Sequence, residues 1–173
     1  MTAPFPSLII SAAGFTPQGA FAEAQATFLN PDPATIDELV AALIAENIGI
    51  VAHFDRDVGL QGVLTAAAAR WPHIAISDSL AMADTAVKMA EEGVKAVVVL
   101  GVDFMSENVR AVLDAAGHHA LPVYRVDKRE IGCSLASSAE ARAYGAWLHK
   151  ATATPRSLHV IYINTGLDVK GHA

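Results

Sequence analysis

The chain alternates short β-rich runs with helical stretches along most of its length. We expect strands at 8–11, 48–53, 73–77, 96–100, 121–125 and 158–163. The run from Ala96 to Leu100 is apolar throughout rather than alternating, as in strands buried on both faces of a parallel sheet. Strands that are separated by helices of about 10–15 residues indicate βαβ units. The pattern therefore predicts an α/β fold with a three-layer, mostly parallel, doubly wound sheet.

Helices are expected at about 36–46, 59–70, 80–92, 106–116 and 138–150. Two capping boxes, Thr35 with Glu38 and Ser137 with Glu140, are expected to begin the first and the last of them. Residues 1–35 contain five prolines and are expected to form an irregular N-terminal segment, which wraps the domain or contacts a partner. Residues 36–173 are expected to form a single α/β domain.

Composition excludes several classes of protein. The 173 residues carry 12 Lys and Arg against 18 Asp and Glu, and this acidic balance argues against nucleic-acid binding. No apolar run approaches the roughly 20 residues that span a bilayer, and the N-terminus lacks the basic region of a signal peptide. The single cysteine excludes an internal disulfide and indicates a reducing compartment. We expect a soluble, cytoplasmic protein with no membrane or nucleic-acid partner.

Polar side chains follow several predicted strands, where doubly wound sheets bind ligands. His53 and Asp55 follow the strand at 48–53, and a histidine there can carry protons near neutral pH. A histidine that only bonds a backbone carbonyl is the alternative. Ser79, beside Asp78, either caps the next helix or holds a phosphate or carboxylate together with the N–H groups of that helix.

Three further candidates lie later in the chain. Cys133 precedes a predicted helix, whose N-terminus favours the thiolate form, although most lone cysteines are small buried hydrophobes. One thiolate cannot complete an iron–sulfur or zinc site. Tyr162 and Asn164 lie on one face of the last predicted strand, where they either orient a carboxylate or phosphate or form an ordinary strand-to-turn junction. Phe104 and Met105 are expected to be packing residues.

In this order the motifs at 52–53, 78–80, 101–107, 132–136, 162–165 and 169–170 resemble the N-terminal part of the quinolinate synthase family. The resemblance covers about residues 48 to 170. It implies a transferase or lyase that joins iminoaspartate and dihydroxyacetone phosphate to form quinolinate during NAD synthesis. It also implies an oxygen-sensitive [4Fe-4S] cluster held by three cysteines, within three related α/β domains around a central site.

The resemblance assigns a role to each candidate. His53 and Ser79 match residues that bind substrate, Cys133 matches the first cluster ligand, and Tyr162 and Asn164 match residues that contact substrate and intermediate. We therefore expect His53, Asp55 and Tyr162 to be catalytic. Asp55 stands where the family usually has a catalytic tyrosine, and a carboxylate can move protons but differs from a phenol in shape and pKa. The two other cysteines, the His-x-Glu motif and the second half of the phosphate site are absent from this sequence.

Three hypotheses follow from the retained and absent motifs. The chain is a subunit of an iron–sulfur enzyme, and a partner subunit supplies the remaining ligands and the catalytic carboxylate. Alternatively it is a cluster-free relative that forms a homo-oligomer. In the third hypothesis it is a non-catalytic module that binds a small phosphorylated or dicarboxylic ligand.

Overall fold

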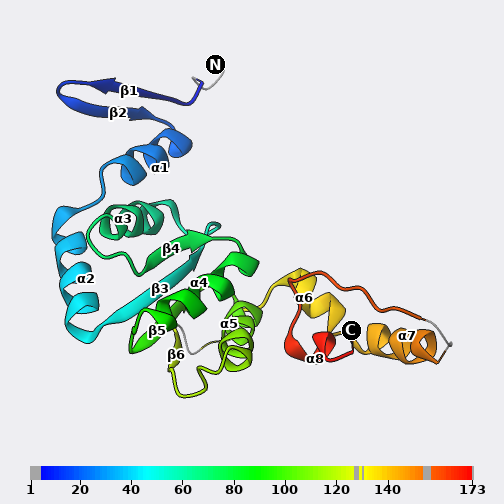
Figure 1. The fold of residues 1–173 in the computed structure, drawn as a ribbon. Coiled ribbons are helices and arrows are strands. Elements are labelled where there is room, and N and C mark those ends of the chain that lie inside the picture. Colours follow the sequence, from blue (N-terminus) through cyan, green and yellow to red (C-terminus); the bar gives the residue numbers. More distant parts are fainter. Residues whose placement is uncertain (1–4, 127–128, 130, 154–156, 173) are drawn as a thin grey trace.

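The structure is a computed structural model that describes residues 5–126, 129, 131–153 and 157–172. It consists of a four-stranded sheet between helices, an N-terminal hairpin with its own helix, and a C-terminal part that extends to one side (Figure 1). The elements are β1 (Ser7–Ser11), β2 (Gly14–Gln18), α1 (Ala20–Leu29), α2 (Pro33–Glu46), β3 (Ile48–His53), α3 (Val58–Ala68), β4 (Ile74–Ser77), α4 (Ser79–Glu91), β5 (Ala96–Leu100), α5 (Asp103–Ala115), β6 (Val123–Arg125), α6 (Ser134–Ala139), α7 (Arg142–Thr152) and α8 (Leu167–Lys170).

The central sheet has the strand order β4-β3-β5-β6, and all its neighbouring strands are parallel. Successive residues of β3 point to opposite faces, so Val51 packs with α4 and α5 whereas Ile50 and Ala52 pack with α2 and α3. Two apolar clusters therefore cover the two faces of one sheet. This arrangement confirms the predicted α/β fold with a doubly wound, three-layer sheet. Within the described ranges, no helix has the length and apolar character to cross a membrane.

The first helix of this domain, α2, begins at Pro33, three residues before the expected start at residue 36. The carboxylate of Asp32 accepts hydrogen bonds from the backbone N–H of Thr35 at 3.0 Å and from its hydroxyl at 2.6 Å. Pro33 occupies the first helical turn, where its fixed φ fits and its missing N–H costs nothing. The prediction that Thr35 and Glu38 form the cap is therefore wrong, because Asp32 already caps the helix.

The second capping box is also wrong. Ser137 lies inside α6, and the helix expected at 138–150 is two helices that are separated by a break at residues 140–141. The second of these, α7, begins after Ala141 without a side-chain cap. The spacing of Ser137 and Glu140 matched the motif, but the helix had already begun at Ser134.

The segment at 158–163 was predicted to be a strand and has no strand partner in the part of the chain that the structure describes. Leu158, Val160 and Tyr162 are 84%, 80% and 62% exposed, so the alternating apolar side chains face solvent. The β propensity of such a pattern depends on packing against neighbouring strands, and these residues have none. The strand predicted at 8–11 is present as β1, but it pairs antiparallel with β2 outside the main sheet.

The N-terminal hairpin is attached to the domain through α1. Helix α1 packs closely on α3, where Gly62 is buried against the backbone of Phe28. A Cβ atom at Gly62 would lie 2.7 Å from the carbonyl oxygen of Phe28, which is too close for any side chain. Residues 7–29, expected to be irregular, thus hold two strands and a helix. The site lies elsewhere, at the carboxyl ends of β3 to β6.

Candidate functional site

The carboxyl ends of the four parallel strands lie side by side at one edge of the sheet. The register pairs His53 of β3 with Ser77 of β4, Ala52 with Leu100 of β5, and Val99 with Arg125 of β6. β3 and β5 are neighbours in the sheet, but the helices that follow them, α3 and α5, cover opposite faces. Such a switch point is where open α/β sheets bind ligands.

His53 ends β3 and is 8% exposed. Its Nδ1 lies 2.8 Å from Oδ1 of Asp55, and its ring stacks on Phe54 with centroids 4.5 Å apart. The same carboxylate oxygen accepts hydrogen bonds from Nε and Nη2 of Arg56, at 2.9 and 2.6 Å. The structure therefore brings the predicted pair His53 and Asp55 together and adds a guanidinium to it.

Burial raises the pKa of the Asp55 carboxyl, but the hydrogen bonds from Arg56 and His53 outweigh it, so the pKa is lowered from its ordinary 3.8. The folded protein then binds this proton less readily than the unfolded chain does. The stabilisation is full above about pH 4 and is lost as the pH falls through the lowered pKa. Because the carboxylate is half exposed, solvent screening keeps this contribution small.

We expect Asp55→Asn to lower stability at neutral pH and to make the acid side of the stability curve shallower. Urea unfolding of both proteins between pH 3 and pH 7 measures this. A constant difference between the two proteins at all these pH values would contradict the assignment.

Ser79 is the first residue of α4 and is 4% exposed. The preceding residue, Asp78, caps the helix, because its Oδ1 accepts from the backbone N–H groups of Leu80 and Ala81, each at 2.9 Å. These bonds hold the pKa of Asp78 below its ordinary value, and His53 adds to the effect through its charge. Asp78, and not Ser79, is therefore the residue that caps α4.

Cys133 lies next to the ends of β5 and β6, in a cavity of about 580 Å³. Asp103 lines the same cavity. Its Oδ1 is paired with Arg125, and its Oδ2 accepts a hydrogen bond from the backbone N–H of Ile131 at 3.1 Å. Glu107 also lines this cavity. The thiol is half-buried and immediately precedes α6. The cavity is polar and acidic, with one guanidinium.

These residues do not fit an iron–sulfur cluster by themselves. The whole sequence contains one cysteine, and a cluster of this kind needs thiolates on at least three of its irons. Among the residues that the structure describes, no group of three or more His, Cys, Asp or Glu side chains could hold a metal ion. Cys133 could be one ligand only if other thiolates came from outside this chain.

Tyr162 and Asn164 lie in the C-terminal part, and no described contact joins them to His53 or Ser79. Tyr162 is 62% exposed, whereas Oδ1 of Asn164 is buried and has no hydrogen-bond partner within the described residues. Lys170 holds this segment: its ammonium donates to Oδ1 of Asn108 on α5 at 2.5 Å. It also donates to the backbone carbonyls that flank Asn164, those of residues 163 and 165, at 2.8 and 2.6 Å.

The structure therefore forms two groups from the predicted residues. His53, Asp55 and Ser79 lie together at the ends of β3 and β4, and Cys133 lies across the edge beside β5 and β6. No described contact joins Tyr162 or Asn164 to either group. That the six residues act in one reaction stays a prediction.

Sequence reasoning missed two charged residues at this edge and one in the C-terminal part. Arg56 directly follows Asp55, and Arg125 ends β6, so the strand-end rule could have identified both. The bond from Lys170 to Asn108 joins residues 62 positions apart, and no local pattern in the sequence indicates it.

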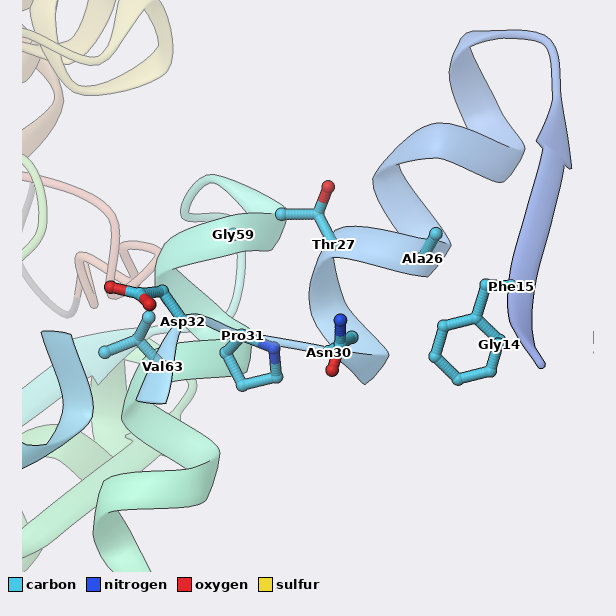
Figure 2. Close-up of a pocket in the computed structure, with 9 residues that line it drawn as sticks. All are labelled: Gly14, Phe15, Ala26, Thr27, Asn30, Pro31, Asp32, Gly59 and Val63. Atoms are coloured by element: carbon cyan, nitrogen blue, oxygen red, sulfur yellow. The ribbon is translucent and has the colours of Figure 1, made fainter. Parts of the chain in front are cut away.

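A further cavity of about 650 Å³ lies between the N-terminal segment and α3 (Figure 2). Phe15 of β2, Thr27 of α1 and Val63 of α3 are among the residues that line it. None of the predicted site residues is among them. Its one carboxylate, that of Asp32, already caps α2, so this cavity offers no comparable chemistry.

Known proteins are similar to nearly the whole of this chain. The family model described as quinolinate synthetase A protein matches residues 36–173. A protein named quinolinate synthase, chloroplastic, from Oryza sativa subsp. japonica is 58% identical over 98% of this chain. Proteins of the same name from Arabidopsis thaliana and Nicotiana tabacum are 55% and 56% identical, again over 98% of this chain. The chain spans only 24% of the rice and Arabidopsis proteins and 23% of the tobacco protein. By the extent of these matches, the chain belongs to the quinolinate synthetase A protein family.

Proposed function

We propose that this chain supplies part of the substrate site of a quinolinate synthase, which condenses iminoaspartate with dihydroxyacetone phosphate in NAD biosynthesis. The observation that carries the proposal is the convergence of His53, Ser79 and Cys133 on the carboxyl edge of the sheet. Family membership supports the same reaction. His53, Asp55 and Tyr162 are the proposed catalytic residues, and His53, Ser79, Tyr162 and Asn164 the proposed substrate-binding residues.

The chemistry proposed for these residues is proton transfer and anion binding. Closing an aromatic ring from two aliphatic molecules moves protons on and off carbon and oxygen, and a histidine can accept and return them. The N-terminus of α4, beside Ser79, carries the partial positive charge that suits a carboxylate or phosphate. The substrates of this reaction carry both kinds of anion.

The site needs contributions from outside this chain. The chain has one cysteine, so a [4Fe-4S] cluster would require thiolates from a partner subunit, from further copies of this chain or from additional polypeptide. Cys133 is the proposed ligand on this side. Location in the cytoplasm stays a prediction from composition, and the plant relatives are named chloroplastic.

An assay of quinolinate formation tests the proposal. The chain is purified anaerobically, alone and together with a polypeptide that supplies the missing cysteines. It is then given iminoaspartate and dihydroxyacetone phosphate, and quinolinate is measured by mass spectrometry. We expect product, with bound iron and sulfide, only in the combined sample. Cys133→Ser should abolish it, and Cys133→Ser protein that forms as much quinolinate as the unsubstituted protein would contradict the proposal.

A second function is favoured by the replacement of the usual tyrosine by Asp55 and by the single cysteine. In this alternative the chain binds a small phosphorylated or dicarboxylic ligand without turnover, as a cluster-free oligomer or a binding module. Binding of dihydroxyacetone phosphate, aspartate or quinolinate would raise the thermal midpoint by mass action. A raised midpoint with no product in any combination would favour it.

A further inference from the structure

The contacts of His53 bear on which of its two ring nitrogens carries the proton. A carboxylate accepts hydrogen bonds but has no proton to donate. The 2.8 Å approach of Asp55 Oδ1 to His53 Nδ1 is therefore a hydrogen bond only if Nδ1 carries the proton. The backbone N–H of Asp55 also faces Nδ1, at 3.4 Å, and would need the opposite arrangement. The contact with the carboxylate is the closer of the two and has a charged acceptor, which favours a proton on Nδ1.

Arg56 holds the Asp55 carboxylate in place. Two of its nitrogens bind the same oxygen that faces His53, so that oxygen is held on both sides. These bonds also help to keep the pKa of Asp55 below its ordinary value, so the carboxyl is ionised at neutral pH. The imidazole comes from the last residue of β3, and the carboxylate and the guanidinium come from the short loop that follows it.

We infer that Asp55 and Arg56 hold neutral His53 as the Nδ1–H tautomer, so that Nε2 is the proton-accepting atom of this site. The two ring nitrogens of a histidine are not equivalent, and the bond made by one decides the role of the other. No bond to Nε2 is present among the residues that the structure describes. Asp78, whose pKa is lowered in part by His53, is another carboxylate near the ring.

The contact between Asp55 and His53 gives a role to Asp55, which stands where the family usually has a tyrosine. A tyrosine at position 55, as the resemblance implies for other members, has a hydroxyl that can either donate or accept. Asp55 can only accept, so it selects one tautomer. The inference rests on the site of the proposed function but not on its reaction, since a tautomer can be measured without turnover.

Nuclear magnetic resonance of the whole chain with ¹⁵N-labelled histidine tests the inference. Long-range proton–nitrogen spectra distinguish a protonated from an unprotonated ring nitrogen, and His53→Gln identifies the signals of His53 among the seven histidines. At a pH where the ring is neutral, we expect a protonated Nδ1 and an unprotonated Nε2. Asp55→Ala should remove this preference and move the signals toward the Nε2–H form. Asp84→Ala, which removes an exposed carboxylate from α4, should leave them unchanged.

Arg56→Met should raise the pKa of Asp55, followed through its ¹³C carboxyl signal, while the tautomer stays the same at neutral pH. An Nε2–H ring in the unsubstituted protein would overturn the inference, as would an unchanged tautomer in folded Asp55→Ala. If that variant does not fold, the tautomer of the unsubstituted protein decides alone. Failure to bind substrates would contradict the proposed function and would leave this result untouched.

Discussion

Replacing Lys170 with methionine should detach the C-terminal segment from α5. The ammonium of Lys170 makes three hydrogen bonds and lies 5.7 Å from the ring centroid of Phe104. Burial lowers the pKa of Lys170 from 10.5, with Glu107 acting in the opposite direction, so the group is partly withdrawn from water. Methionine keeps most of the length and apolar volume of the side chain but donates no hydrogen bond.

The loss of stability is large because the substitution leaves the acceptors of Lys170 without their donor. Asn108 is 5% exposed, and its Nδ2 already has no partner within the described chain, so the substitution would leave its Oδ1 unpaired as well. An unpaired buried polar group costs about 1–3 kcal/mol, and bonds to charged groups contribute about as much. We expect the free energy of opening of residues 157–172 to fall by about 2–3 kcal/mol.

Amide hydrogen exchange measures this opening segment by segment. Lys150→Met, which removes an exposed ammonium from the last turn of α7, is the matched control and should change exchange little. Equal exchange at 157–172 in both variants would show that Lys170 does not hold the segment.

Replacing Gly62 with alanine should weaken the attachment of the N-terminal hairpin and α1. The added Cβ would meet backbone atoms of Phe28 at 2.7 to 3.2 Å, and backbone cannot move aside as a flexible side chain can. Overpacking of this kind costs about 1–3 kcal/mol, which exceeds the gain of about 0.5–1 kcal/mol that alanine gives inside a helix. We expect net destabilisation and faster proteolysis near the junction of α1 and α2.

The same substitution at Gly145 is the control. Gly145 lies inside α7, and apart from its chain neighbours and the backbone of its own helix no described atom lies within 4 Å of the place where its Cβ would be. Only the helical preference then acts, so Gly145→Ala should stabilise its helix by about 0.5–1 kcal/mol. Urea unfolding of both variants should give changes of opposite sign, and changes of the same sign would refute the close packing of α1 on α3.

The central sheet could be predicted because its signals are local. The apolar run at 96–100 became β5 with those bounds, and the junctions that follow the strands placed His53, Asp55 and Ser79 at one edge. Phe104 and Met105 are buried packing residues, as expected. In each case neighbouring residues in the sequence decide the outcome.

The errors have different physical causes. At Asp32 and Ser134 the structure uses an earlier helix start than the motif suggested, because several nearby residues can begin a helix and only one does. The segment at 158–163 has the pattern of a strand, but a strand also needs neighbours. The bond between Lys170 and Asn108 depends on how two distant segments meet, which no local pattern encodes.

Ligand binding to the carboxyl edge of the sheet tests the central claim most directly. Amide spectra of the chain are recorded with increasing quinolinate and, separately, dihydroxyacetone phosphate. We predict shifts that saturate at residues 53–56, 78–80 and 101–103, where β3, β4 and β5 end. Absence of shifts there, or shifts confined to the opposite edge around Asn47 and Gly93, would contradict the claim that this edge is the ligand site.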